Sequence, residues 1–186
     1  MNESSEFCCR IPQTVALTRF EELDGNEHKK ILEWRNHPLV SRWMIRQDPI
    51  APSEHMAFVR SLHADRSKAY FKVTLRNEPI GVIDFYRMDR IKKSAYYGYY
   101  LRPDRLGSSL GILLEYVVLE YGFSKLRLDS ILAETNPSNT TAMRLHQRFG
   151  AIEGIINQRG LQESIFHAKD WWRQRLKWSG IVSRLV

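Results

Sequence analysis

The clearest change of hydrophobic pattern lies in the last third of the chain. Residues 128–133 form a short apolar run that predicts a buried strand, and Asn136 and Pro137 end it because proline cannot donate to a strand ladder. After Asn139, a residue type that often caps helices, apolar side chains recur three or four positions apart. Gly150 stands where a left-handed residue ends a helix. This stretch therefore predicts a strand, a polar turn, a short helix and a glycine stop.

The first third of the chain predicts one strand followed by helices. Residues 14–20 alternate in polarity, which is typical of a strand. Asp24 and Glu27 have the spacing of a capping box, and Pro38 ends the helix that they begin, because the residue before proline avoids the helical region. The helices expected here span about residues 25–35, 40–44 and 53–63.

The middle of the chain predicts a sheet. Three alternating segments joined by short turns indicate an antiparallel meander. The most regular helix follows, with one apolar face repeating at helical spacing. Because this helix stands between two strands, those strands are expected to pair in parallel within a mixed sheet. The expected strands span residues 70–76, 80–86, 95–101, 128–134, 151–159 and 163–169, and the helix spans residues 110–121.

Length and composition fit one globular domain. The chain has 186 residues, of which 43% are hydrophobic and 26% are charged. Residues 14–172 form the expected core, residues 1–11 a loose lead-in, and residues 173–186 a basic, tryptophan-containing tail that we expect to pack on the body. The sequence contains no apolar run long enough to predict a membrane span or a signal peptide. A cytoplasmic protein is therefore expected.

The charge of the chain narrows the ligands. The formal net charge of +7 is compatible with nucleic acid, with small phosphorylated ligands or with a solvated surface. No basic run with interleaved aromatic residues is present, so nucleic acid is not expected and a pocket for a polyphosphate ligand is favoured. The only cysteines, Cys8 and Cys9, are adjacent, so they cannot link distant segments through a disulfide. They also lack the spacing of metal ligands, and no metal site is expected.

The stretch from residue 134 to residue 150 resembles the last core motif of the GNAT superfamily of acyl-CoA-dependent N-acetyltransferases. The residues that carry this resemblance are Glu134, Asn139, Ala142, Leu145 and Gly150. The resemblance implies a single GNAT domain with an α/β fold: a mixed, mostly antiparallel sheet with a splayed parallel strand pair and helices on both faces. It also implies acetyl-CoA as co-substrate, with no metal.

The loop before the central helix is the expected cofactor site. A helix N-terminus offers unpaired N–H groups to a pyrophosphate, small residues allow close approach, and Arg105 can add a charged contact. The resemblance is partial here, because Ser108 and Leu110 stand where the family usually has glycine, unless the loop shifts by one residue to use Gly107 and Ser109. It further implies that the pantetheine arm pairs with strand backbone beside the splay. The expected cofactor-binding residues are Tyr100, Leu101, Arg105, Leu106, Gly107, Ser108, Ser109, Leu110, Gly111 and Asn139.

Acetyl transfer to an amine requires a base for the ammonium and a proton for the leaving thiolate. His146 stands where the family usually has a tyrosine that protonates the thiolate, and a histidine can also donate a proton. Asp84 and Glu134 are the candidate bases, acting directly or through water. The alternatives are that His146 faces the core with a backbone partner and that Asp84 only binds a neighbouring arginine.

The acceptor is indicated by a second resemblance. The run Arg35-Asn36-His37-Pro38 with Trp43-Met44 matches a subset of the superfamily, and is most similar to sugar-nucleotide N-acetyltransferases of pseudaminic acid synthesis. This implies transfer to the 4-amino group of a UDP-linked 4-amino-4,6-dideoxy sugar. The residues that it places along the substrate pocket are Arg35, Trp43, His55, Phe58, Tyr86 and Arg87.

Alternatives to this acceptor stay open. Residues 35–72 carry seven Arg or Lys against three Asp or Glu, which favours an anionic acceptor over a polyamine. A ribosomal-protein-type N-terminal acetyltransferase remains an alternative, as does a non-enzymatic acyl-CoA sensor. A homodimer is compatible with the sequence.

Overall fold

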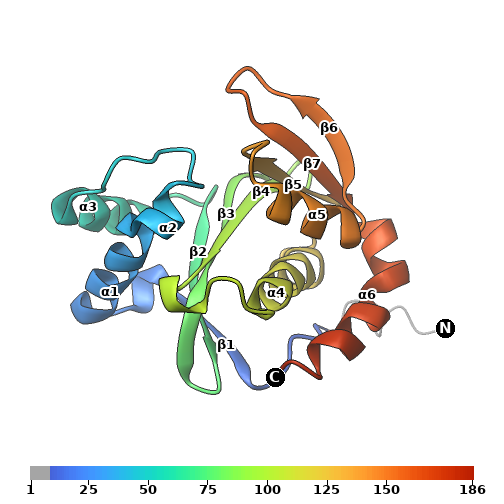
Figure 1. Cartoon of the computed structure of the whole chain (residues 1–186), viewed down its shortest axis with the longest axis horizontal. Helices are drawn as coiled ribbons and strands as arrows, with labels where there is room; N and C mark the ends of the chain where they lie inside the picture. The colour runs from blue at the N-terminus through green and yellow to red at the C-terminus, as the bar shows by residue number, and fades with distance from the viewer. Residues whose placement is uncertain (1–8) are drawn as a thin grey trace.

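The computed structural model describes residues 9–186, so the expected lead-in falls largely outside the described residues, as does Cys8. The described chain forms a seven-stranded sheet with the spatial order β1-β2-β3-β4-β5-β7-β6. Figure 1 shows α1, α2 and α3 grouped on one side of this sheet and α4, α5 and α6 on the other. The strands are β1 (Val15–Arg19), β2 (Ala69–Leu75), β3 (Glu78–Asp89), β4 (Ser94–Leu101), β5 (Ser130–Thr135), β6 (Ile152–Ile156) and β7 (Gln162–His167).

Most helices begin and end close to their predicted positions, but α2 ends at Ser41, so Trp43 and Met44, which were expected in this helix, lie in the turn after it. Asp24 and Glu27 form the predicted capping box, in which each side chain accepts a hydrogen bond from the other residue's backbone N–H. Asn139 caps α5 by accepting from the N–H of Ala142, and Gly150 adopts the predicted left-handed conformation at φ 84°. The helices are α1 (Gly25–Asn36), α2 (Pro38–Ser41), α3 (Pro52–Leu62), α4 (Leu110–Ser124), α5 (Thr140–Arg148) and α6 (Ala168–Val182), with short 3-10 turns at Phe20–Glu22 and Pro103–Arg105.

The sheet has the predicted topology. β2, β3 and β4 form the antiparallel meander, and β4 pairs with β5 in parallel across the α4 crossover. The parallel pairing covers only four residue pairs and ends at Tyr97 and Ala133. β4 then continues to Leu101 and β5 to Thr135 without pairing to each other, which confirms the predicted parting of the two strands.

α4 differs from its prediction in how much of it is buried. We expected one apolar face, but nearly every side chain from Leu113 onward is buried, because the sheet covers one side and α6 packs on another. Glu120 is fully buried and accepts hydrogen bonds from the Arg10 N–H (2.8 Å) and the Trp171 indole N–H (2.9 Å). This carboxylate therefore joins both ends of the described chain to the central helix.

The C-terminal segment is more ordered than its sequence pattern suggested. The expected strands at 151–159 and 163–169 are shorter, and α6 begins directly after β7. Trp171 and Trp178 are buried, and Trp178 stacks on Phe149 with ring centroids 3.7 Å apart, which confirms that the tail packs on the body. Within residues 9–186, no helix combines the length and apolar character needed to cross a membrane.

Two helical glycines test this packing. A methyl group at Gly122 would lie 2.5 Å from Ile131 Cδ1 and 3.0 Å from Phe85 Cε1, whereas one at Gly180 would meet no atom within 4 Å. We expect Gly122→Ala to lower the free energy of unfolding by about 1–3 kcal/mol through overpacking. Gly180→Ala should raise it by about 0.5–1 kcal/mol through helix propensity. Urea unfolding of both variants measures this difference, and a Gly122→Ala protein as stable as Gly180→Ala would contradict the packing.

Candidate active site

The gap between β4 and β5 is the centre of the candidate site. Beyond the last parallel pair, residues 98–101 of β4 face residues 134–135 of β5 without pairing to them. We call this gap the slot. Backbone N–H and C=O groups in such a gap need another partner, and an extended amide-containing ligand can supply it. Tyr100 and Leu101, expected to bind the cofactor through their backbone, lie along the slot while pairing with β3 on their other side.

The loop that follows β4 brings the other expected cofactor residues to one end of the slot. Gly107 has a φ of +78°, and an added Cβ there or at Gly111 would meet no atom within 4 Å, so the loop surface is open. Ser108 Oγ donates to the Arg105 carbonyl and accepts from the Leu110 N–H, which shapes the turn before α4. The N-terminus of a 15-residue helix thus lies open beside a half-exposed arginine, an arrangement suited to a pyrophosphate.

Not every residue expected to bind the cofactor has a free side chain. The side-chain oxygen of Asn139 is engaged as the α5 cap, 3.2 Å from the Ala142 nitrogen. Leu106 is 39% exposed at the loop surface, Ser109 is the residue that immediately precedes α4, and Leu101 is buried.

A buried polar cluster lies on the face of the sheet that α4 covers. His146 Nδ1 lies 3.0 Å from Glu115 Oε1 and 3.0 Å from the Tyr97 hydroxyl, and His146 Nε2 lies 3.2 Å from Thr135 Oγ1. Tyr97 also donates to Glu115 Oε1 at 2.7 Å. Burial, followed by the charge of Glu115, raises the pKa of Tyr97 well above its ordinary value, so the phenol keeps its proton.

His146 therefore has side-chain partners rather than the backbone partner that we considered as its alternative. It is 4% exposed, so its imidazole is enclosed by this cluster and by Phe166, whose ring meets it edge to face. Thr135, the last residue of β5, stands beside the unpaired part of β4. The chemistry of His146 is thus connected to the slot through a hydroxyl group.

Asp84 lies on the opposite face of the sheet, which α1 and α3 cover. Its carboxylate is partly buried and makes no hydrogen bond or ion pair with any residue in the range 9–186. Burial raises the pKa of Asp84 to about 7, and the charge of Arg35 opposes this shift without cancelling it. Across the sheet, Gly98 leaves the space open, since a Cβ there would lie 3.0 Å from Asp84 Oδ2. An unpaired carboxylate with this pKa is suited to remove a proton near neutrality.

Arg35 extends from α1 toward the same face. One guanidinium nitrogen, Nη2, donates to the Arg46 carbonyl at 2.6 Å, while Nη1 is buried and has no hydrogen-bond partner in the described part of the chain. Burial lowers the pKa of Arg35, and the nearby groups of Tyr100, Asp84 and Tyr70 partly restore it. A buried donor without a partner is uncommon in proteins, and an anionic ligand would satisfy it.

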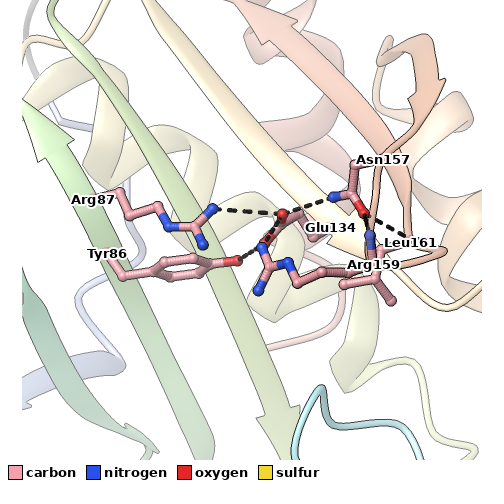
Figure 2. Close-up of polar contacts among 6 residues, drawn as sticks. All are labelled: Tyr86, Arg87, Glu134, Asn157, Arg159 and Leu161. Atoms are coloured by element: carbon pink, nitrogen blue, oxygen red, sulfur yellow. Dashed lines mark hydrogen bonds and ion pairs between the residues drawn. The ribbon is translucent and has the colours of Figure 1, made fainter.

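Glu134, the other candidate base, is occupied. Figure 2 shows Tyr86, Asn157 and Arg159 converging on its carboxylate, with Arg87 Nη1 at 3.5 Å. The Tyr86 hydroxyl donates to Oε2 at 3.1 Å and Asn157 Nδ2 donates to Oε1 at 2.8 Å. The side chain is 1% exposed and surrounded by these donors, and we call this cluster the brace. The geometry favours Asp84 over Glu134 as the base.

This brace forms part of a cavity of about 480 Å³ between the segment after α2 and the β6–β7 turn. Arg87 approaches Glu134 from a bulge in β3, where the Arg87 backbone has a φ of 51°. Tyr86 and Tyr96 stack beneath Arg87 with ring centroids 5.6 Å apart. The cavity is lined by Trp43, Met44, Ile45, Gln47, Glu134, Asn136, Arg159, Gly160 and Leu161.

Two residues expected in the substrate pocket lie deeper on this side of the sheet. Phe58 packs edge to face on Tyr70, with ring centroids 4.9 Å apart. His55 is 7% exposed, and its Nε2 lies 3.2 Å from His28 Nδ1 against Phe20. Burial lowers the pKa of both histidines. His55 thus belongs to the apolar packing behind the site, because a neutral histidine pair is stable there.

Four residues of the site were missed by the sequence analysis. Glu115 and Glu120 interrupt a mostly apolar helix, and that break in the pattern was the one local signal for Glu115. Tyr97 and Thr135 resembled ordinary strand residues, and Arg159 resembled an ordinary charged residue before a turn. No group of three His, Cys, Asp or Glu side chains able to hold a metal ion occurs among residues 9–186.

Two parallel strands that separate beside an open helix N-terminus have the arrangement of an acyl-CoA-dependent acyltransferase. Residues 16–152 match the family model described as acetyltransferase (GNAT) domain. Two acetyltransferases named PseH, from two strains of Campylobacter jejuni, are 37% and 34% identical to the chain over 134 residues. These span 72% of this chain and 82% of each relative.

Solved structures agree with this assignment. The crystal structure of C. jejuni PseH is 27% identical, with a TM-score of 0.68 over 83% of this chain and 98% of that one, and it has also been solved with acetyl coenzyme A. A spermidine N-acetyltransferase from Vibrio cholerae, solved with CoA and spermine, has a TM-score of 0.74 at 18% identity, over 86% of this chain and 99% of that one. The second likeness shows the fold alone.

The chain belongs to the GNAT acetyltransferase family. It is an N-acetyltransferase, as the sequence predicted. The GNAT fold predicted from the sequence is confirmed as well.

The isolated carboxylate of Asp84 generates a pH prediction. A base acts when ionised, so kcat/KM should rise with pH through about 7. In Asp84→Asn we expect this limb to disappear and kcat/KM at pH 8 to fall by about 100-fold or more. A pH–rate profile with unchanged shape and height in the variant would exclude Asp84 as the base.

Stability serves as the control for this variant. Because the folded pKa of about 7 exceeds the ordinary value of 3.8, the folded protein favours the protonated carboxyl and loses stability as pH rises between these values. Asparagine removes that ionisation, so Asp84→Asn should be at least as stable as wild type at pH 8. A loss of activity in the variant then cannot be ascribed to unfolding.

Proposed function

We propose that this enzyme acetylates the 4-amino group of a UDP-linked 4-amino-4,6-dideoxy sugar, the reaction of pseudaminic acid synthesis to which the sequence resemblance points. The relatives named PseH, at 34–37% identity, support this choice of acceptor. The proposed reaction is a direct attack of the amine on the acetyl-CoA thioester within a ternary complex.

One observation carries the proposal. A carboxylate without a hydrogen-bond partner, Asp84, and a cation with an unpaired buried nitrogen, Arg35, face the same side of the sheet and influence each other's pKa. An acceptor that bears an amine and a diphosphate would use both groups, because the carboxylate takes the ammonium proton and the guanidinium binds the phosphate.

The charges around the cavity also favour an anionic acceptor. Arg159 and Arg87 are 41% and 53% exposed, and both are oriented by the enclosed carboxylate of Glu134. Trp43 is 37% exposed at the cavity and offers an aromatic surface for a base or sugar ring. A polyamine site would instead need several free carboxylates, and Glu134 is already bound by donors. The polyamine alternative is therefore less well supported.

The chemistry follows from these positions. Asp84 takes a proton from the ammonium, and the free amine then attacks the thioester carbonyl carbon in the slot. The tetrahedral adduct expels the CoA thiolate as the new C–N bond is completed. The thiolate receives a proton from the His146 side of the slot, and the second proton of the original ammonium passes to solvent. A cytoplasmic location, where acetyl-CoA and nucleotide sugars are both available, is part of this proposal.

A homodimer is part of the proposal too. β6 lies at the edge of the sheet, and its side chains Ile152, Ile155 and Ile156 are 55–72% exposed. An edge strand with exposed apolar residues is suited to pairing with another strand. We propose that a second copy of the chain covers it.

A panel of amines tests the acceptor. With acetyl-CoA, thiol release should be fastest with the UDP-linked amino sugar and at least about 100-fold slower with spermidine or an N-terminal peptide, because only the first provides a diphosphate for Arg35. Arg35→Gln should raise KM for the nucleotide sugar about tenfold and leave KM for acetyl-CoA unchanged. As a matched control, Arg66→Gln, which removes an arginine from the loop between α3 and β2, should behave as wild type. Preferred turnover of spermidine would contradict the proposal.

A further inference from the structure

α4 contains two glutamates with no exposed surface, and their environments differ. Both oxygens of Glu120 have partners, because the Arg10 N–H binds Oε1 and the Trp171 indole binds Oε2. Glu115 shares one oxygen between Tyr97 and His146, while its Oε2 is buried and has no hydrogen-bond partner among residues 9–186. A buried carboxylate with an unpaired oxygen costs stability. Glu120 therefore has the arrangement of a structural residue, and Glu115 does not.

The hydrogen bonds around Glu115 determine where the hydrogens of Tyr97 and His146 lie. Burial, followed by the charge of the nearby Glu115, raises the pKa of Tyr99 well above its ordinary value, but no hydrogen bond of normal geometry joins Tyr99 to Oε2. Because Tyr97 retains its proton and Glu115 accepts, the hydrogen of a neutral His146 ring must lie on Nδ1, facing Glu115. Nε2 is then directed toward Thr135 Oγ1.

Thr135 stands between this imidazole and the slot. It is the last residue of β5 and lies two positions beyond Ala133, whose pairing with Tyr97 ends the parallel ladder. Both side chains are buried, His146 at 4% and Thr135 at 7% exposed, and Thr135 is the one that lies on the strand end bordering the slot. The order carboxylate, imidazole, hydroxyl, slot is the arrangement of a proton relay.

We propose that Thr135 is the group that gives a proton to the leaving CoA thiolate, and that Glu115 is a positioning residue that holds the Nδ1 hydrogen of His146, so that Nε2 faces Thr135 and is the nitrogen that resupplies it. This inference rests on the proposed role of His146 as the source of the proton.

The proton transfers balance. When the C–S bond breaks, the sulfur takes the hydrogen of Thr135 Oγ1. The same oxygen takes the Nε2 hydrogen of a doubly protonated His146. The ring becomes neutral and keeps its Nδ1 hydrogen, which remains hydrogen-bonded to Glu115. Solvent then returns one proton to Nε2. The buried carboxylate of Glu115 is the counter-charge for the imidazolium.

Two measurements test the relay. The first is ¹⁵N NMR of histidine-labelled protein without substrate, with the His146→Gln variant used to assign the ring. We expect the Nδ1–H tautomer for neutral His146 in wild type and in Glu120→Gln, and a mixture with Nε2–H in Glu115→Gln. An Nε2–H tautomer in the wild type would overturn the proposal, whichever amine the enzyme acetylates.

The second measurement is steady-state kinetics with the amine that gives the highest turnover. Glu115→Gln should lower kcat about 10- to 100-fold with KM for acetyl-CoA within twofold of wild type. Thr135→Val should lower kcat similarly, whereas Thr135→Ser should keep most of it, because serine retains the hydroxyl. In Glu120→Gln, kcat should be unchanged although stability falls.

The kinetic outcomes separate this inference from the choice of acceptor. A wild-type kcat in Thr135→Val would exclude Thr135 as the donor, and a wild-type kcat in Glu115→Gln would exclude the positioning role. Activity only toward a different amine would contradict the proposed acceptor and leave the relay to be judged by the same variants. If Glu115→Gln fails to fold, two results still test the relay: the tautomer of His146 in the wild-type protein, and the kcat values of Thr135→Val and Thr135→Ser.

Discussion

The site depends on the place where two parallel strands stop pairing. β4 and β5 share four residue pairs and then separate after Tyr97 and Ala133, although both strands continue. The separation leaves strand backbone without a partner in the middle of a seven-stranded sheet, where an extended ligand can take the missing place. Every other part of the site is arranged around this slot: the open N-terminus of α4 lies at one end, and candidate proton-transfer groups lie on each face.

Alternation along the strands distributes the chemistry between the two faces of the sheet. Asp84 and Glu134 face the side of α1–α3, where the cavity and the arginines lie, while Tyr97 and Thr135 face α4. In the proposed reaction, this separation keeps the base that accepts the ammonium proton away from the group that protonates the thiolate. The two groups would neutralise each other if they shared one face, because they must hold opposite protonation states at the same time.

Three buried glutamates show how one residue type serves different purposes. Glu120 binds the two ends of the described chain to α4, and Glu134 orients arginines from β3 and the β6–β7 turn. Both have all their oxygens engaged by donors. One oxygen of Glu115, beside His146, has no hydrogen-bond partner among residues 9–186, and burying it lowers the stability of the fold. The hydrogen-bond partners, rather than the burial, distinguish the structural carboxylates from the one with a proposed functional role.

The sequence by itself determined the order of elements, the meander, the capping box at Asp24 and the helix that ends at Gly150, because each depends on residues a few positions apart. It also located the slot and its loop through a family resemblance. The tertiary structure decided which side chains meet: His146 with Glu115 across 31 residues, Glu134 with Arg159 across 25, and His55 with His28 in a buried pair. Such contacts have no local period, and they form only when the sheet brings distant segments together and excludes water from between them.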